Sequence, residues 1–195
     1  MIAAVILSIA ASTPAGAVAV THIAPLRSSI PAGMEIGSRG TGWSCFPSGS
    51  LHWRDLSFNP EEAAHTVAAA LAREGIATES SADDGGREPD QASPLSAQIL
   101  SGTISTITVK ACSPQWGLGK MLGGGSKIKG QVSITIDWML RPREGGRSTN
   151  FTTRADTKIA ARRGDYDALL TEGLNVVSKA AAGRLRGDWL TRSSE

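Results

Sequence analysis

Three long stretches in the second half of the chain have the pattern of β-strands, and they constrain the fold most. The clearest is 131–140, where apolar and polar residues alternate: Val132, Ile134, Ile136 and Trp138 against Ser133, Thr135 and Asp137. Residues 95–112, rich in isoleucine, threonine and serine, predict a second strand that bends near Gly102, and 149–161 predict a third. Strands of this kind bury one face, so they need a covering layer.

Two amphipathic helices are expected to supply that layer. In 59–75, Asn59 can cap the first amides, Pro60 suits the first helical position, and Gly75 suits the left-handed end. The inner stripe of this helix is Ala63, Val67, Ala70 and Leu71. A second helix is predicted over 165–190, with an inner stripe of Leu169, Leu170, Leu174, Val177 and Ala181.

The predicted order is β-α-β-β-β-β-α, in which residues 50–58 form the first strand and 76–80 the second. This order indicates an α+β fold with a mainly antiparallel sheet and two helices packed on one face. Residues 51–195 are expected to form a single domain, and 18–50, which contain Pro25 and Pro31, an extended lead-in.

Composition excludes some classes of protein. The 195 residues are 41% hydrophobic and 19% charged, which favours one folded domain over a disordered chain. The formal net charge is only +2. Nucleic-acid binding needs clustered lysine and arginine, so it is not expected here.

The first 17 residues, MIAAVILSIAASTPAGA, contain no charged residue. Ala15 and Ala17 fit the small-x-small rule, so we interpret residues 1–17 as a signal peptide cleaved after Ala17. Neither Lys nor Arg precedes the apolar run, which leaves two alternatives: a start of translation further upstream, or a buried strand. Export would place the protein in the periplasm. No cysteine follows the run to accept a lipid.

The chain has two cysteines, Cys45 and Cys112, and each is followed by turn-forming residues. Two strand ends can meet at the same edge of a sheet. An exported chain meets oxidising conditions, so we predict a disulfide between the two residues. The alternative is two separate buried thiols.

The glycine-rich stretch 117–131 resembles a phosphate loop only superficially. A phosphate loop needs Gly-Lys-Ser/Thr followed by a helix, whereas here the order is Gly-Gly-Gly-Ser-Lys and a strand follows. We therefore expect a hairpin tip. Exposed apolar residues beside lysines would suit a partner protein or an anionic membrane surface. The predicted contact residues are Trp116, Lys120, Met121, Leu122, Lys127 and Lys129. The alternative is a plain connector whose apolar residues fold back onto the sheet.

Catalytic patterns are scarce in this sequence. His22, His52 and His65 lack the spacing of metal ligands, and no serine lies in a G-x-S-x-G elbow. Asp137 lies within a strand and is expected on its solvent side. We therefore expect no enzyme activity, no cofactor and no metal site.

The layout from Leu51 to Leu190 resembles small envelope proteins of Gram-negative bacteria. These include the auxiliary lipoproteins of ABC-type lipid transport systems and related periplasmic assembly factors. The resemblance rests on the helix NPEEAAHTVAAALAREGI, the strands LSAQILSGTISTITV and KGQVSITIDWMLRP, and the segment TKIAA before a terminal helix. It implies an α+β domain that binds partner proteins. The missing lipid-attachment cysteine departs from the lipoprotein members.

Three functional hypotheses follow, of which the third is a hydrolase without a recognisable motif. The first is a non-enzymatic periplasmic subunit or accessory factor of an envelope complex, associated with the outer membrane, which acts through protein contacts. The second is a periplasmic binding module for a small or lipidic ligand, using the sheet face that the helices leave open. An apolar cavity of several hundred Å³ would favour the second.

The signal-peptide interpretation predicts that the mature protein begins at Val18. Mass spectrometry of the protein purified from its native host tests this. An intact Met1 on the mature form would contradict it.

Overall fold

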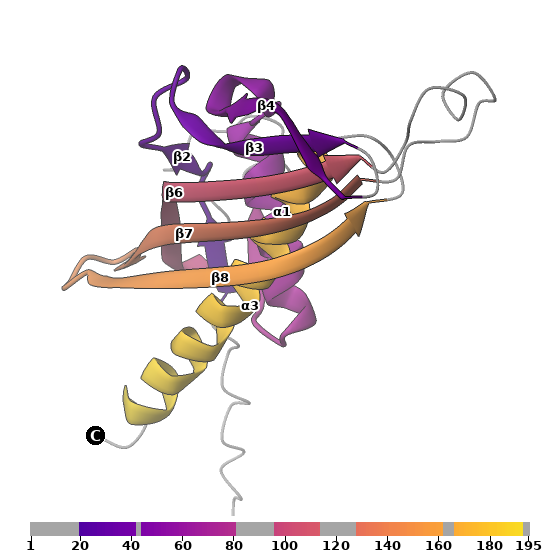
Figure 1. Cartoon of the computed structure of the whole chain (residues 1–195). Coiled ribbons are helices and arrows are strands. Elements are labelled where there is room, and N and C mark those ends of the chain that lie inside the picture. The colour runs from indigo at the N-terminus through magenta and orange to yellow at the C-terminus, as the bar shows by residue number, and fades with distance from the viewer. Residues whose placement is uncertain (1–19, 42–43, 81–95, 114–127, 162–165, 193–195) are drawn as a thin grey trace, which may run out of the picture.

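One 18-residue strand, β6 (Ser96–Ser113), forms the centre of the sheet and determines where the other elements lie. The structure is a computed structural model that describes residues 20–41, 44–80, 96–113, 128–161 and 166–192. Within these residues, eight strands form one sheet and two α-helices cover one of its faces (Figure 1). The expected α+β fold is confirmed.

On one side, β6 pairs with β7 (Ile128–Pro142), and β7 pairs with β8 (Thr149–Ala161). Both pairings are antiparallel, with fourteen and thirteen residue pairs. The alternation of β7 is confirmed, because Val132, Ile134, Ile136 and Trp138 are all buried. These two ladders supply most of the pairing in the sheet, which is therefore mainly antiparallel.

On its other side, β6 pairs with three segments that follow one another along the chain: β1 (Val20–Ile23), β2 (Arg27–Ser28) and β3 (Glu35–Thr41). All three run parallel to β6. Beyond them lie β4 (Phe46–His52), which pairs with β3, and β5 (Thr78–Ser80), which pairs with β1. The segment predicted as an extended lead-in thus supplies strands of the same sheet, interrupted at its prolines.

The strand predicted over 50–58 is wrong beyond His52. There the chain enters a 3-10 turn, η1 (Trp53–Asp55). The backbone N–H of His52 donates to the Asp55 carboxylate at 2.8 Å, and this bond competes with a continued strand. The same hydrogen bond lowers the pKa of Asp55. Trp53 and Leu56 are both buried, since the turn places residues three apart on one side.

A β-bulge at Ser105 explains why the apolar pattern of β6 changes phase. Ile104 is opposite Ile136, and Thr106 is opposite Thr135, so Ser105 has no direct partner. Before the bulge, Leu100 and Ile104 face the helices; after it, the buried positions are Ile107, Val109 and Ala111. One extra residue therefore keeps apolar side chains inside along the whole strand.

The helices α1 (Pro60–Arg73) and α3 (Asp167–Arg192) match the sequence prediction closely. The Asn59 side chain accepts hydrogen bonds from the amides of Glu61 and Glu62, and Gly75 has a φ of 83°. Every residue of both predicted inner stripes is buried. In the described part of the chain, neither helix has the length and apolar character needed to cross a bilayer.

Gly102 and Trp138 form a close contact that fixes β6 against β7. The two residues are directly opposite, and a Cβ on Gly102 would lie 2.7 Å from the Trp138 ring. The indole N–H donates to the Thr153 hydroxyl at 2.7 Å, and Phe151 stacks against the ring at 6.3 Å. The buried indole thus links β6, β7 and β8.

We predict that Gly102→Ala destabilises the protein by about 1–3 kcal/mol, because the added methyl group must displace the Trp138 ring. The matched control is Gly33→Ala, where nothing lies within 4 Å. Its effect should stay within about 0.5 kcal/mol. Urea unfolding measures both. Equal effects in the two variants would contradict the packing argument.

Candidate binding cavity on the open face of the sheet

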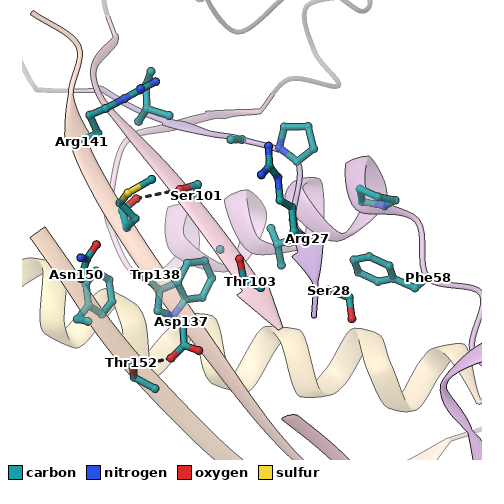
Figure 2. Close-up of a pocket in the computed structure, with 18 residues that line it drawn as sticks. Arg27, Ser28, Phe58, Ser101, Thr103, Asp137, Trp138, Arg141, Asn150 and Thr152 are labelled. Carbon is teal, nitrogen blue, oxygen red and sulfur yellow. Dashed lines mark hydrogen bonds between the residues drawn. The ribbon is translucent and has the colours of Figure 1, made fainter. Parts of the chain in front are cut away.

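A cavity of about 1280 Å³ lies where the chain segment 24–28 and the start of α1 meet β6, β7 and β8. Its polar wall is built from side chains on the sheet face opposite the helices (Figure 2), while the core residues Leu26 and Trp138 and the half-buried Phe151 also line it. The second functional hypothesis named this open face as its binding surface.

Strand register assembles the polar wall. Thr103, Asp137 and Thr152 are directly opposite one another across β6, β7 and β8, and all three line the cavity (Figure 2). The Thr152 hydroxyl donates to the Asp137 carboxylate at 2.7 Å. Asp137 is exposed, which confirms the prediction that it faces away from the core. The next row holds Ser101 and Asn150.

Two arginines border the cavity. Arg27, on β2, is paired with Thr103, while Arg141, near the end of β7, is paired with Ile99. Both guanidinium side chains are exposed, and Asp137 is the one carboxylate among the lining residues. The charged lining is therefore net positive. Guanidinium groups bind carboxylate and phosphate oxygens in a two-pronged geometry.

Apolar side chains complete the lining. Phe58, Ile99 and Met139 all border the cavity. Met139 is 43% exposed, one of three large apolar side chains that lie open to solvent in the described residues. The Ser101 hydroxyl donates to the Met139 carbonyl at 3.3 Å, which helps to hold this part of the wall. A site with arginines beside apolar groups suits an amphipathic anion.

The helix start positions the aromatic side of the cavity. The Leu26 amide donates to the Pro60 carbonyl at 3.1 Å, which ties the β1–β2 segment to the first turn of α1. Phe58 lies just before the Asn59 cap and packs against Trp53, with ring centroids 5.3 Å apart. The capping signal visible in the sequence therefore also orients a cavity residue.

Cys45 and Cys112 are joined in a disulfide, with Cα atoms 5.5 Å apart, so this prediction is confirmed. The bond connects the turn before β4 to the end of β6. Cys45 adopts a φ of 53°, and Gly40 lies directly beneath it, where a Cβ would meet the Cys45 Sγ at 2.5 Å. Neither cysteine is among the residues that line the cavity.

The predicted hairpin contact falls largely outside the described residues, which exclude Trp116, Lys120, Met121, Leu122 and Lys127. The stretch does connect the antiparallel strands β6 and β7, as the sequence predicts. Lys129 is exposed on β7 and borders a smaller cavity of about 440 Å³, which Lys158 of β8 also lines. Residues 1–17 also lie outside the described part.

The histidines and carboxylates do not gather at the cavity. His22 is buried in β1, His65 is exposed on α1, and His52 lies 3.7 Å from the Asp55 carboxylate. Among the described residues, no three His, Cys, Asp or Glu side chains are arranged to hold a metal ion.

Sequence reasoning missed Arg27, Phe58 and Arg141 as cavity residues. They lie on three separate segments, and only the parallel pairing of β2 with β6 brings Arg27 to the strands that carry Arg141. Alternation did give a usable signal for β7, because Asp137, Met139 and Arg141 follow one another on its polar face.

Comparison with known proteins gives no family assignment. No family model matches the chain, and no curated protein matches it. Solved structures with a similar arrangement include a protein from Xanthomonas campestris of family-model DUF330, at 12% identity, 94% coverage of each chain and a TM-score of 0.45. The PelC dodecamer from Paraburkholderia phytofirmans matches at 11% identity, 87% and 90% coverage and a TM-score of 0.38. A minor lipoprotein from Acinetobacter baumannii matches at 9% identity, 70% and 90% coverage and a TM-score of 0.27. These sequence identities and TM-scores are too low to assign the function of any of these proteins to this chain.

The disulfide closes a loop of 67 residues, and we predict that it stabilises the fold by about 4 kcal/mol through the unfolded state. The double variant Cys45→Ser/Cys112→Ser should show this loss in urea unfolding. Thiol titration of the denatured, unreduced wild type should find no free thiol. Two titratable thiols would contradict the assignment.

Proposed function

We propose that this protein is a non-enzymatic binding protein of the bacterial envelope, and that the open-face cavity holds a small or lipidic ligand with an anionic group. The observation that carries this proposal is the cavity of about 1280 Å³ with Arg27 and Arg141 at its border. Ligand cavities commonly measure about 300–1,000 Å³, so this one has room for an acyl chain together with its head group.

The lining supports an amphipathic ligand rather than a purely polar one. The arginines can bind a carboxylate or phosphate, and Ser101, Thr103 and Asn150 offer further hydrogen bonds. Phe58 and Met139 offer apolar surface to the remainder of the ligand. A ligand without an anionic group would leave the arginines unmatched, and a ligand without an apolar part would leave Phe58 and Met139 unmatched.

The lining favours binding over catalysis. A nucleophilic serine or threonine needs an adjacent base within hydrogen-bond reach. Here the Ser101 hydroxyl donates to a backbone carbonyl, and the Thr152 hydroxyl donates to Asp137 in an exposed pair. A backbone carbonyl is not a base, and the Asp137 carboxylate is exposed to water, where a carboxylate is a weak base for a hydroxyl proton. These contacts support the binding proposal over a catalytic one.

The disulfide supports the cellular location in this proposal. Disulfides persist in oxidising compartments such as the periplasm and are rare in the cytosol. The Cys45–Cys112 bond is therefore consistent with export, as is the apolar segment 1–17. We place the protein in the periplasm, in association with the outer membrane.

A second candidate is a subunit or accessory factor of an envelope complex that acts through protein contacts. Lys129 favours it, because this residue is exposed where β7 begins, next to the predicted contact residues of the hairpin. This candidate assigns the binding role to residues 116–129. Lys129 lies at the start of β7, whereas the cavity residues of β7 lie near its end.

We predict that Arg27→Gln and Arg141→Gln each weaken binding of a dansyl-labelled long-chain fatty acid by about tenfold, because each removes a charge-assisted contact to the carboxylate. Fluorescence titration measures the affinity. The corresponding alcohol should bind the wild type more weakly and respond little to either substitution. The matched control is Arg184→Gln, which removes the same charge from the exposed face of α3.

Equal affinity in all three variants would contradict the cavity assignment. If, in addition, deletion of residues 117–126 abolished co-purification with envelope proteins, the second candidate would replace the first.

A further inference from the structure

Strand β8 forms one border of the sheet (Figure 1). It is 13 residues long, and β7 is its one partner among the described strands. One edge of β8 pairs with β7. The backbone N–H and C=O groups on its other edge, from Asn150 to Ile159, therefore face no other described strand. Long, regular edges invite pairing with another strand.

The other two borders of this sheet carry the protective features that edge strands usually have. Strand β4 contains Pro47 and two irregularities in its pairing with β3. Strand β5 has only three residues. Strand β8 has no proline, and its register with β7 is regular throughout. Its exposed charges, Arg154, Asp156 and Lys158, are of both signs, so they can pair with a second strand as well as repel one. The contrast indicates that the edge of β8 is built to be paired.

We propose that β8 pairs with β8 of a second copy of this chain, antiparallel and two-fold symmetric about Ala155. Ala155 is the midpoint of β8, so the whole strand takes part. In this register Arg154 is opposite Asp156 of the second copy, Phe151 is opposite Ile159, and Thr153 is opposite Thr157. Each pair occurs twice because of the symmetry.

Charge selects this register over its neighbours. Arg154 and Asp156 lie 3.6 Å apart within one chain, with side chains 68% and 54% exposed. When the two-fold axis passes between the two copies of Ala155, Arg154 and Asp156 of both chains form one cluster in which positive and negative charges alternate. Centring it on Arg154 would place two arginines opposite each other, and centring it on Asp156 would place two aspartates opposite each other. Like charges directly opposite are destabilising.

The apolar side of β8 is complementary in the same register. Phe151 and Ile159 are half-buried and pack against the core on the helix face. Opposite each other across the two-fold axis, they would cover the surface that each protomer leaves open. An axis perpendicular to the sheet keeps both helix layers on the same side, so one continuous sheet results.

Sedimentation of the full mature chain as a function of concentration tests the proposal. Wild type should form a dimer with a Kd at or below about 10 µM. Arg154→Asp and Asp156→Arg should each weaken the dimer by about tenfold or more, because each places like charges opposite each other twice. The double variant Arg154→Asp/Asp156→Arg should return to within about threefold of wild type, since opposite charges face each other again. Lys110→Asp is the control, because it reverses an exposed charge on β6, away from the edge.

Cross-linking provides a readout of register. With Cys45 and Cys112 already bonded, Ala155→Cys adds the one free thiol of the chain. Opposed Cα atoms in an antiparallel pair lie about 4.5 or 5.5 Å apart, within disulfide range. Ala155→Cys should therefore give a disulfide-linked dimer under mild oxidation, whereas Thr157→Cys should not. Circular dichroism should first verify that each variant is folded.

A wild type that stays monomeric at about 100 µM would overturn the proposal. So would a dimer or larger assembly that ignores the single charge reversals, or a Thr157→Cys variant that cross-links as well as Ala155→Cys. Binding of a different protein to β8, with no self-association, would assign the edge to another partner and would equally overturn it.

Discussion

The register between β6 and β7 is the constraint on which the rest of the structure depends. A slip of either strand by one residue would turn every buried side chain of that strand to the other face. Two local features oppose such a slip. The bulge at Ser105 fits only one alignment of the apolar pattern, and Gly102 provides the space that the Trp138 ring fills. The indole is fixed in turn by Thr153. Together they set which side chains face the helices and which face the cavity.

The same alignment gives the open face its chemical character. Because Ile136 and Trp138 must face the helices, Asp137 and Met139 must face the other way. The polar groups on that face tolerate water, so the sheet needs no second helical layer. The interrupted segment β1–β2 then borders this face and places Arg27 beside Thr103. Core packing and ligand binding thus use alternate residues of the same strands.

Elements with strong local signals could be predicted from the sequence. Asn59 and Pro60 marked the start of α1, and the bounds of β8 were predicted to the residue. The strands before Pro47 could not be recognised, because they are short, lack alternation and depend on parallel pairing with a strand far along the chain. Gly102 makes a close contact with Trp138, and the irregularity in the pairing of β6 lies three residues later, at Ser105.

The site was predictable only in part, for the same reason. The open face followed from placing both helices on one side of the sheet, and Asp137 followed from alternation. Arg27 and Phe58 join the cavity through long-range pairing and through the Leu26–Pro60 hydrogen bond, which no local pattern encodes. The disulfide was predictable because the chain has only two cysteines and the expected compartment is oxidising. The two residues could therefore only be bonded to each other or remain as separate thiols.

Amide chemical-shift mapping during titration with an unlabelled long-chain fatty acid tests the central claim most directly. The account predicts saturable shifts at Arg27, Ser101, Thr103, Met139 and Thr152, with none at the exposed positions Glu172 and Arg184 of α3. Shifts confined to the helices, or no saturable shifts on the open face, would contradict it.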